Sequence, residues 1–260
     1  MACKKSLISL LFVTISICSV QAQKTIARGG FWKTYNAVPN SIEALNAAQD
    51  LQLFGTECDV RLTADDVALI FQQEKVGNTP TEQLTTDDLQ TSAIYTLPNG
   101  ESIPTLDAYL KQYIQNTLMF GSPTKLVLDL QPHKSVDKTE TLIDIVVERI
   151  TSYRLTEQTI IISSDFYVCK QIKERMPQAN VLYKKGDKSP KEISHARLSG
   201  ICYPAQVLTE HTEWISEAHT MNMKVFAWTI NTTESANEMR QLGVDALITD
   251  EPDAIAPITR

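Results

Sequence analysis

The sequence predicts an α/β protein built as a (β/α)8 TIM barrel. From Lys24 onward, short segments rich in β-branched and aliphatic residues alternate with helical patterns, an order typical of a parallel sheet. The length of 260 residues, of which 43% are hydrophobic, suits one barrel with a single large core. No charge block, low-complexity tract or Pro/Gly-rich linker divides the chain, so we expect one domain over residues 23–260.

Nine segments have the composition of buried strands, one more than a barrel requires. They are residues 25–28, 56–61, 67–71, 125–130, 159–163, 180–183, 200–203, 224–230 and 246–249. The link from Val60 to Val67 is too short for a crossover helix. We therefore expect one of the two segments that it joins to pair irregularly, and the sequence does not say which.

Apolar positions at helical spacing predict helices between these strands. Asn40-Ser41 supplies a capping side chain before a helix that starts at Ile42. The other helical patterns cover residues 105–116, 138–154, 166–176, 210–221 and 234–242. Residues 76–103, with Thr79-Pro80 and Pro98-Asn99-Gly100, form the one long irregular stretch, and we expect this insertion to lie over the active face.

The first residues have the pattern of a secretory signal peptide. Lys4 and Lys5 precede an apolar run over residues 7–20, and Val20-Gln21-Ala22 offers small residues for cleavage. We expect residues 1–22 to be removed and the protein to be exported, to the periplasm or the extracellular space. The apolar run is shorter than a bilayer span and no later run is longer, so no transmembrane span is expected. A lipoprotein form through Cys18 is an alternative, although Ile17 is bulky for that signal.

Charge and cysteine content restrict the partners and the chemistry. Loss of Lys4 and Lys5 lowers the formal net charge from −7 by two, to −9, and an acidic surface repels nucleic acid and anionic lipid. Cys58, Cys169 and Cys202 remain, widely spaced and odd in number, which argues against a disulfide framework and a zinc site. We expect them to be buried apolar residues.

Three carboxylates indicate a cation site. Glu57 and Asp59 are two residues apart in one predicted strand and so point to the same side, and Asp129 comes at the end of another strand. Strand carboxyl ends are where barrel sites assemble, and hard oxygen ligands favour Ca²⁺ or Mg²⁺. The alternative is a structural ion network in which the acids pair with Arg28 or Arg61.

Motifs along nearly the whole mature chain resemble the glycerophosphodiester phosphodiesterase family, which belongs to the PLC-like phosphodiesterase type of TIM barrel. The matching stretches, in chain order, are Ala27-Arg28-Gly29, Val38-Pro39-Asn40-Ser41, Glu57-Cys58-Asp59 with Leu62-Thr63-Ala64-Asp65-Asp66, Phe71-Gln72-Gln73, Asp129-Leu130-Gln131, Trp228-Thr229-Ile230-Asn231 and the closing segment 243–252. The resemblance implies hydrolysis of glycerophosphodiesters with one divalent cation. It implies Glu57, Asp59 and Asp129 as metal ligands, Arg28 as an anion-binding group and Trp228 as a wall against the substrate's alcohol. The alternative for Trp228 is a packing role inside the barrel.

The same resemblance places non-titrating residues where the family has its two acid/base histidines. Ala27 stands at the first position and Gln72 at the second, and neither exchanges protons near neutral pH. Pro39, Gln73 and Gln131 replace a metal-associated glutamate, an aspartate and a phosphate-facing lysine, respectively. Each acid/base group typically contributes about 10²- to 10⁴-fold to a rate, so loss of both predicts little turnover.

Three hypotheses follow. The first is an exported pseudoenzyme that keeps a Ca²⁺ or Mg²⁺ site and binds a small phosphodiester or other anionic headgroup. The second is an active, divergent phosphodiesterase of lipid and glycerol metabolism in which His133 or Glu74 substitutes for a lost histidine. The third is a barrel without metal that serves as a partner surface. Phe31-Trp32, after the first strand, is a candidate aromatic rim, and burial within the loop is the alternative. The sequence does not predict the oligomeric state.

Overall fold

The computed structural model describes residues 24–33, 37–91 and 96–259. The predicted signal peptide, residues 1–22, lies outside the described residues. Within the described part of the chain, no helix combines the length and the apolar character that a membrane crossing requires.

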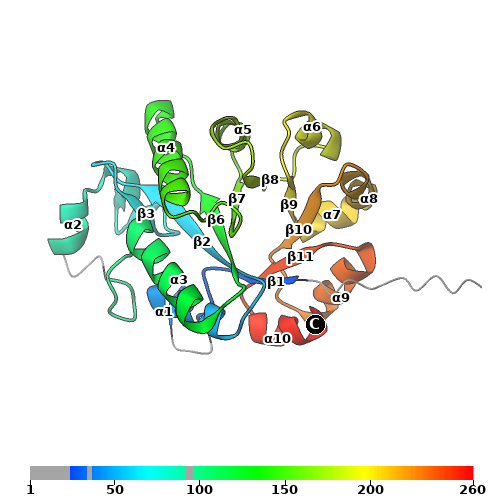
Figure 1. Ribbon diagram of the computed structural model, residues 1–260, viewed down its shortest axis with the longest axis horizontal. Helices are drawn as coiled ribbons and strands as arrows, with labels where there is room; N and C mark the ends of the chain where they lie inside the picture. The colour runs from blue at the N-terminus through cyan, green and yellow to red at the C-terminus, as the bar shows by residue number, and fades with distance from the viewer. Residues whose placement is uncertain (1–23, 34–36, 92–95, 260) are drawn as a thin grey trace, which may run out of the picture.

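Eight parallel strands form a closed barrel (Figure 1). β1 (Lys24–Ala27) pairs with β2 (Gly55–Leu62) on one side and with β11 (Ala246–Thr249) on the other, which closes the ring. Between β2 and β11 follow β6 (Lys125–Leu130), β7 (Thr159–Ser163), β8 (Asn180–Tyr183), β9 (Gly200–Pro204) and β10 (Lys224–Trp228). The predicted fold class is confirmed.

The ninth strand candidate is the one that pairs irregularly. β3 (Ala68–Ile70) runs antiparallel to the end of β2, with Val60 opposite Ile70. The short link between them forms a turn in which the Thr63 hydroxyl accepts a hydrogen bond from the Val67 backbone N–H at 2.9 Å. β3 thus extends the sheet beside the barrel and does not belong to the ring.

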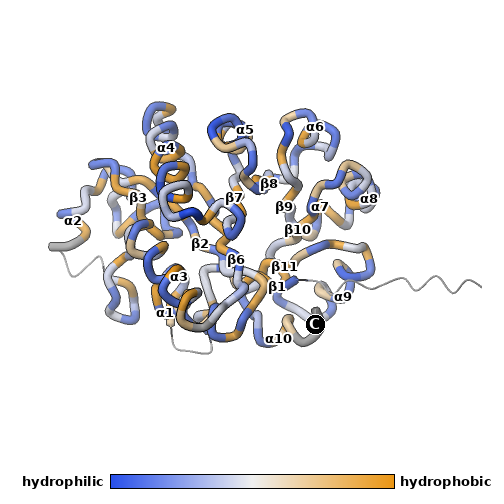
Figure 2. The backbone as a smooth tube through the Cα atoms, viewed as in Figure 1, coloured by the Kyte–Doolittle hydropathy of each residue, from blue (hydrophilic) through white to orange (hydrophobic). Residues whose placement is uncertain are grey.

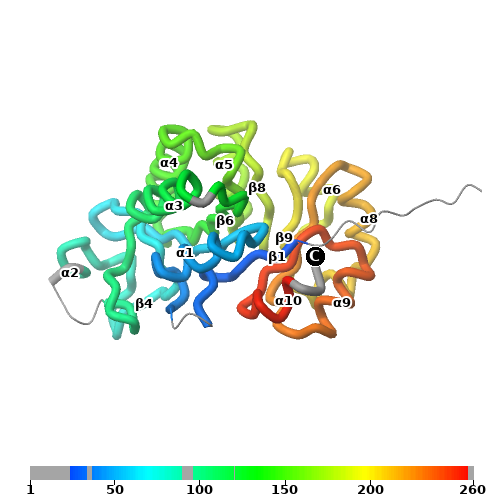
Figure 3. Tube along the Cα trace, turned by 60° about the horizontal axis from the view of Figure 1, so that its bottom comes forward, coloured from blue at the N-terminus to red at the C-terminus, as the bar shows by residue number. Residues whose placement is uncertain are grey.

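Helices surround the strands, and Figure 3 shows α1 and α10 on the two sides of β1. In chain order they are α1 (Ile42–Asp50), α3 (Leu106–Phe120), α4 (Val136–Ser152), α5 (Phe166–Arg175), α6 (Pro190–His195), α7 (Ala205–Glu210), α8 (Glu213–Thr220), α9 (Thr233–Leu242) and α10 (Pro252–Thr259). The Ser41 side chain caps α1 as predicted, by accepting from the Ala44 N–H. The helix predicted over 210–221 is replaced by α7 and α8, and α6 and α10 were not predicted.

The insertion is more regular than its sequence suggests. It contains the hairpin β4 (Lys75–Val76) and β5 (Thr79–Pro80), the 3₁₀ turn η1 (Thr81–Gln83) and the helix α2 (Thr86–Thr91). Gly77 adopts φ +58° in the hairpin turn, a left-handed conformation that glycine accepts without strain. In Figure 1, α2 lies at the outer end of the molecule.

Apolar side chains pack between the strands and helices and also inside the barrel. Figure 2 shows hydrophobic residues in both the strands and the helices. Side chains alternate along a strand, so every second residue faces the barrel axis. The interior cluster includes Ile26, Val127, Leu182 and Phe226. Two residues further along the same four strands, at the mouth, come Arg28, Asp129, Lys184 and Trp228. The alternation therefore places charged side chains at the end of a barrel whose interior is apolar.

Candidate metal and anion site

The three predicted carboxylates converge. Glu57 and Asp59 both face inward from β2, and Asp59 stands directly opposite Asp129 in the β2–β6 pairing. One oxygen from each of the three lies within 4.8 Å of the others. Their exposed fractions are 2%, 4% and 1%, so the acids are buried together.

Glu57 is fixed by the loop that follows β1. The Gly29 backbone N–H donates to Glu57 Oε2 at 2.8 Å. Gly29 has φ +66°, and a Cβ there would lie 2.9 Å from Pro39 Cβ, so the close approach needs glycine. The Gly29 carbonyl also accepts from the Asn40 N–H at 2.8 Å, so the loop after β1 is bonded both to Glu57 and to the segment before α1.

Asp59 is held by two amide side chains. Asn40 Nδ2 donates to Asp59 Oδ2 at 3.1 Å, while Asn40 Oδ1 accepts from the Asp59 backbone N–H at 2.9 Å. Gln131 Nε2 donates to Asp59 Oδ1 at 3.0 Å. These bonds orient the carboxylate without adding a full positive charge, because amides are neutral.

Asp129 contacts a lysine that the sequence analysis missed. Lys184, one residue past β8, donates through Nζ to Asp129 Oδ2 and forms an ion pair with it. Asp129 Oδ1 is buried and has no hydrogen-bond partner among the described residues. Burial of such an oxygen without a partner is costly, and a bound cation would satisfy it.

The cluster raises the proton affinity of its acids. Burial and then the neighbouring Asp59 charge raise the pKa of Glu57 from 4.5 to about 8. Burial also raises the pKa of Asp129 above its ordinary value, although Lys184 acts in the opposite direction. Burial alone would lower the pKa of Lys184, but Asp129 and then Glu57 raise it, so the ammonium stays charged.

The donor set fits a hard divalent cation. Three carboxylate oxygens close to one another, one of them without a hydrogen-bond partner, are the ligands that Ca²⁺ and Mg²⁺ take. A divalent charge would also offset the mutual repulsion that raises the pKa of Glu57. The metal-ligating group contains none of Cys58, Cys169 and Cys202, which are buried free thiols.

A cavity of about 320 Å³ opens beside the acids. Its lining residues are Arg28, Gly29, Trp32, Pro39, Asn40, Asp59, Gln72 and Asp250. Arg28 Nη1 lies 3.2 Å from Asp250 Oδ1, and Asn231 Nδ2 donates to the other oxygen of Asp250 at 2.9 Å. The Arg28 guanidinium is thus oriented at the cavity wall, where it can meet an anion.

Ala27 is not among the residues that line this cavity. Ala27 is fully buried and packs with Ala47, Ala48 and Phe31 in an apolar cluster that faces the helices. Alternation along β1 turns Ile26 and Arg28 inward instead. A histidine at position 27 would face away from the acids, and the β1 side chain beside them is Arg28.

Gln72 and Trp32 do line the cavity. Gln72 reaches the cavity from the segment after β3. Its backbone carbonyl accepts from Arg61 Nε and Nη2 at 3.1 and 3.0 Å. Trp32 Nε1 donates to the Arg28 carbonyl at 3.1 Å, whereas Phe31 is buried in the apolar cluster. Of the expected aromatic rim, only Trp32 borders the cavity.

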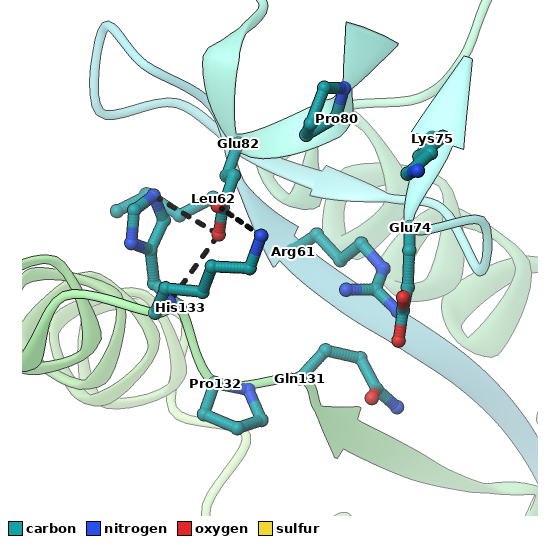
Figure 4. Close-up of a pocket in the computed structure, with 10 residues that line it drawn as sticks. Arg61, Leu62, Glu74, Lys75, Pro80, Glu82, Gln131, Pro132 and His133 are labelled. Carbon is teal, nitrogen blue, oxygen red and sulfur yellow. Dashed lines mark hydrogen bonds and ion pairs between the residues drawn. The ribbon is translucent and has the colours of Figure 1, made fainter. Parts of the chain in front are cut away.

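His133 and Glu74, the predicted substitutes, border a second pocket of about 150 Å³ (Figure 4). His133 Nε2 lies 3.7 Å from Glu82 Oε2, and its Nδ1 accepts from the Ser135 N–H at 3.0 Å. In Figure 4, the Glu74 carboxylate points toward the Arg61 guanidinium. This pocket and the acid cluster share Gln131, which lines the pocket and donates to Asp59.

Trp228 lies where the mouth begins. Its Nε1 donates to the Cys202 carbonyl at 3.0 Å, and its ring packs against the interior apolar cluster. Lys184 Nζ lies 4.9 Å from the centre of the ring, within cation–π range. Trp228 therefore positions Lys184 as well as bordering the mouth. Lys184 follows the predicted strand 180–183 at an inward-facing position, which was the available sequence signal.

Comparison with known proteins agrees with this geometry. Residues 30–254 match the Glycerophosphoryl diester phosphodiesterase family. The chain belongs to this family. A glycerophosphodiester phosphodiesterase of Caldanaerobacter subterraneus is 24% identical over 236 residues, which cover 86% of this chain and 93% of the relative.

Solved structures have the same fold. A glycerophosphodiester phosphodiesterase from Parabacteroides distasonis superposes with a TM-score of 0.86 at 29% identity, covering 92% of this chain and 97% of its own. A phosphodiesterase from Oleispira antarctica, solved in complex with the product sn-glycerol-3-phosphate, has a TM-score of 0.76 at 19% identity. That alignment covers 91% of this chain and 96% of the other.

Proposed function

We propose that this protein binds one divalent cation, Ca²⁺ or Mg²⁺, through Glu57, Asp59 and Asp129 and uses the site to hold a small phosphodiester or a similar anionic ligand. The observation that carries the proposal is the convergence of three buried carboxylates, one with an oxygen that lacks a partner. The cation would neutralise the acids and polarise a phosphoryl oxygen. Arg28 would hold a second ligand oxygen from the cavity wall.

We further propose that hydrolysis by this family member is impaired. Among the described residues that line the cavity, Asn40 and Gln72 are neutral amides and none is a histidine. Neutral amides do not take or give protons near neutral pH. The protein would therefore bind a phosphodiester without efficient transfer of a proton to the leaving alcohol.

An active phosphodiesterase is the second candidate. It is favoured by the names of the relatives, since those from Caldanaerobacter and Parabacteroides are called glycerophosphodiester phosphodiesterases. In that case His133, Glu74 or another titrating group would move the proton. We propose export to the periplasm or the extracellular space in either case, from the signal-like pattern of residues 1–22.

Thermal unfolding with and without Mg²⁺ or Ca²⁺ tests the binding site. Saturation at about 100 times the Kd should stabilise the native protein by about 2.7 kcal/mol. Glu57→Gln keeps the shape of the side chain but not its charge and should lose this gain. Glu43→Gln, in the first turn of α1 and outside the acid cluster, is the matched control. Equal cation response in the native protein and Glu57→Gln would contradict the proposal.

A further inference from the structure

Lys184 is a cation that the chain itself supplies to the acid cluster. It comes from the end of β8, two strands away from β6, and its side chain reaches Asp129 at the barrel mouth. The side chain of Lys184 is 16% exposed and that of Asp129 is 1% exposed, so the pair is largely screened from water. Attraction between unlike charges is strong in such surroundings.

This contact conflicts with a divalent cation on the same carboxylate. The ammonium bonds to Asp129 Oδ2, and a metal bound to Asp129 would be close to it. Two positive charges that share one carboxylate repel each other, and both also act on Glu57, whose charge lies near Lys184. Cation entry therefore weakens or displaces the Lys184–Asp129 contact.

The Trp228 ring is a second group that the Lys184 ammonium contacts. The Trp228 ring lies 4.9 Å from Nζ, and ring faces attract ammonium groups. Trp228 is anchored by its bond to the Cys202 carbonyl, so the ring offers a fixed surface on the mouth side of the pair. An anion at the mouth would give the displaced ammonium a stronger partner than the ring does.

We propose that Lys184 couples the two binding events of the site: it competes with the divalent cation for Asp129, and it contacts the anionic ligand once the cation has displaced it. This inference rests on the proposed function and adds a regulatory step to it. Each ligand then raises the affinity for the other, because the cation releases Lys184 and the anion holds the released group. By linkage the two effects are equal in size.

Calorimetric titration of Mg²⁺ with and without saturating sn-glycerol 3-phosphate tests the coupling. In the native protein the anion should raise Mg²⁺ affinity about fivefold or more. Lys184→Met keeps the aliphatic volume and removes the charge. It should bind Mg²⁺ more tightly than the native protein when no anion is present, and the anion should raise its Mg²⁺ affinity by a smaller factor. Lys184→Gln repeats the comparison if Lys184→Met does not fold.

Lys185→Met is the matched control, because Lys185 is the next residue, its side chain is 60% exposed and it pairs with Asp187. The Lys185→Met variant should show the same Mg²⁺ affinity, and the same effect of the anion on it, as the native protein. Equal Mg²⁺ affinity of the native protein and Lys184→Met without anion, or an unchanged coupling factor, would overturn the inference alone. Absence of Mg²⁺ binding in both would overturn the proposed function and, with it, this inference.

Discussion

Asn40 and Asp59 exchange two hydrogen bonds between the loop before α1 and strand β2. The asparagine amide donates to the carboxylate at 3.1 Å and its carbonyl oxygen accepts from the Asp59 N–H at 2.9 Å. Asn40 is 2% exposed and has φ +67°, a left-handed conformation that asparagine tolerates better than most residues. One buried side chain thus joins the first loop to the proposed cation ligand.

Asn40→Ala should lower the free energy of unfolding by about 1–3 kcal/mol, because it leaves the buried Asp59 N–H without a partner. It should also weaken Mg²⁺ binding, since the Asp59 carboxylate loses a bond that orients it. Urea denaturation and calorimetry measure the two effects. Asn40→Gly removes the same bonds but accepts φ +67°, so the difference between the variants isolates the backbone strain. Unchanged Mg²⁺ affinity in both variants would show that Asn40 does not support the site.

Stability without a metal should fall as pH rises. The folded protein holds a proton on Glu57 with a pKa of about 8, against 4.5 for the ordinary side chain, so the folded state binds more protons than the unfolded state between these values. The contribution is fully present below about pH 4.5 and is lost as pH rises through about 8. Denaturation of chelator-treated protein at several pH values in this range measures it.

Glu57→Gln is the control for that titration. The neutral amide should flatten the pH profile and make the metal-free variant more stable than the native protein at about pH 8. Saturating Mg²⁺ should flatten the native profile too, because a bound cation displaces the proton. A native profile that falls no more steeply between pH 5 and pH 8 than that of Glu57→Gln would contradict the raised pKa.

Gly30→Ala should destabilise the fold by about 3 kcal/mol or more. Gly30 has φ +81°, and an added Cβ would lie 2.7 Å from the Ala44 carbonyl carbon in α1, so strain and overlap combine. Gly77→Ala is the matched control, since Gly77 has φ +58° but nothing within 4 Å of the added atom. It should cost about 1–2 kcal/mol, from conformation alone. Urea denaturation compares the two, and equal losses would disprove the close packing of the first loop.

His133→Ala should leave Mg²⁺ and sn-glycerol 3-phosphate affinities within about twofold of the native values, because His133 bonds to none of the three acids and changes at sites without shared partners are usually independent within about 0.5 kcal/mol. His133 faces Glu82 in the second pocket and does not line the cavity beside Asp59. Gln131→Ala is the contrasting variant, since Gln131 lines that pocket and also bonds to Asp59. It should weaken Mg²⁺ binding. A large loss in His133→Ala would bring the second pocket into the site.

The barrel was predictable because its strands are short apolar runs buried on both faces. The predicted bounds of β6, β7, β8 and β11 agree with the structure residue for residue. The parallel arrangement of the strands was also predictable, because helical segments separate successive strands. The short helices α6 and α10 were missed, because six to eight residues give too few turns for a helical pattern to stand out.

The acid cluster followed from alternation along one strand, which places Glu57 and Asp59 on the same side. Applied to β1, the same rule places Arg28 inward and Ala27 outward, which the order of the motifs does not reveal. Lys184 could not be paired with Asp129 from sequence, since the contact crosses the barrel mouth between strands that are not neighbours. Because the lysine side chain is long and flexible, its position in the sequence does not predict which residue it contacts.

Release of alcohol from a glycerophosphodiester by the purified protein, with saturating Mg²⁺ or Ca²⁺, tests the central claim most directly. The claim is that a cation site persists although no histidine among the described residues lines the cavity beside it. The account predicts that the native protein and Glu57→Gln release alcohol at the same background rate, even though only the native protein is stabilised by the cation. Cation-dependent release by the native protein that disappears in Glu57→Gln would contradict it and establish an active phosphodiesterase.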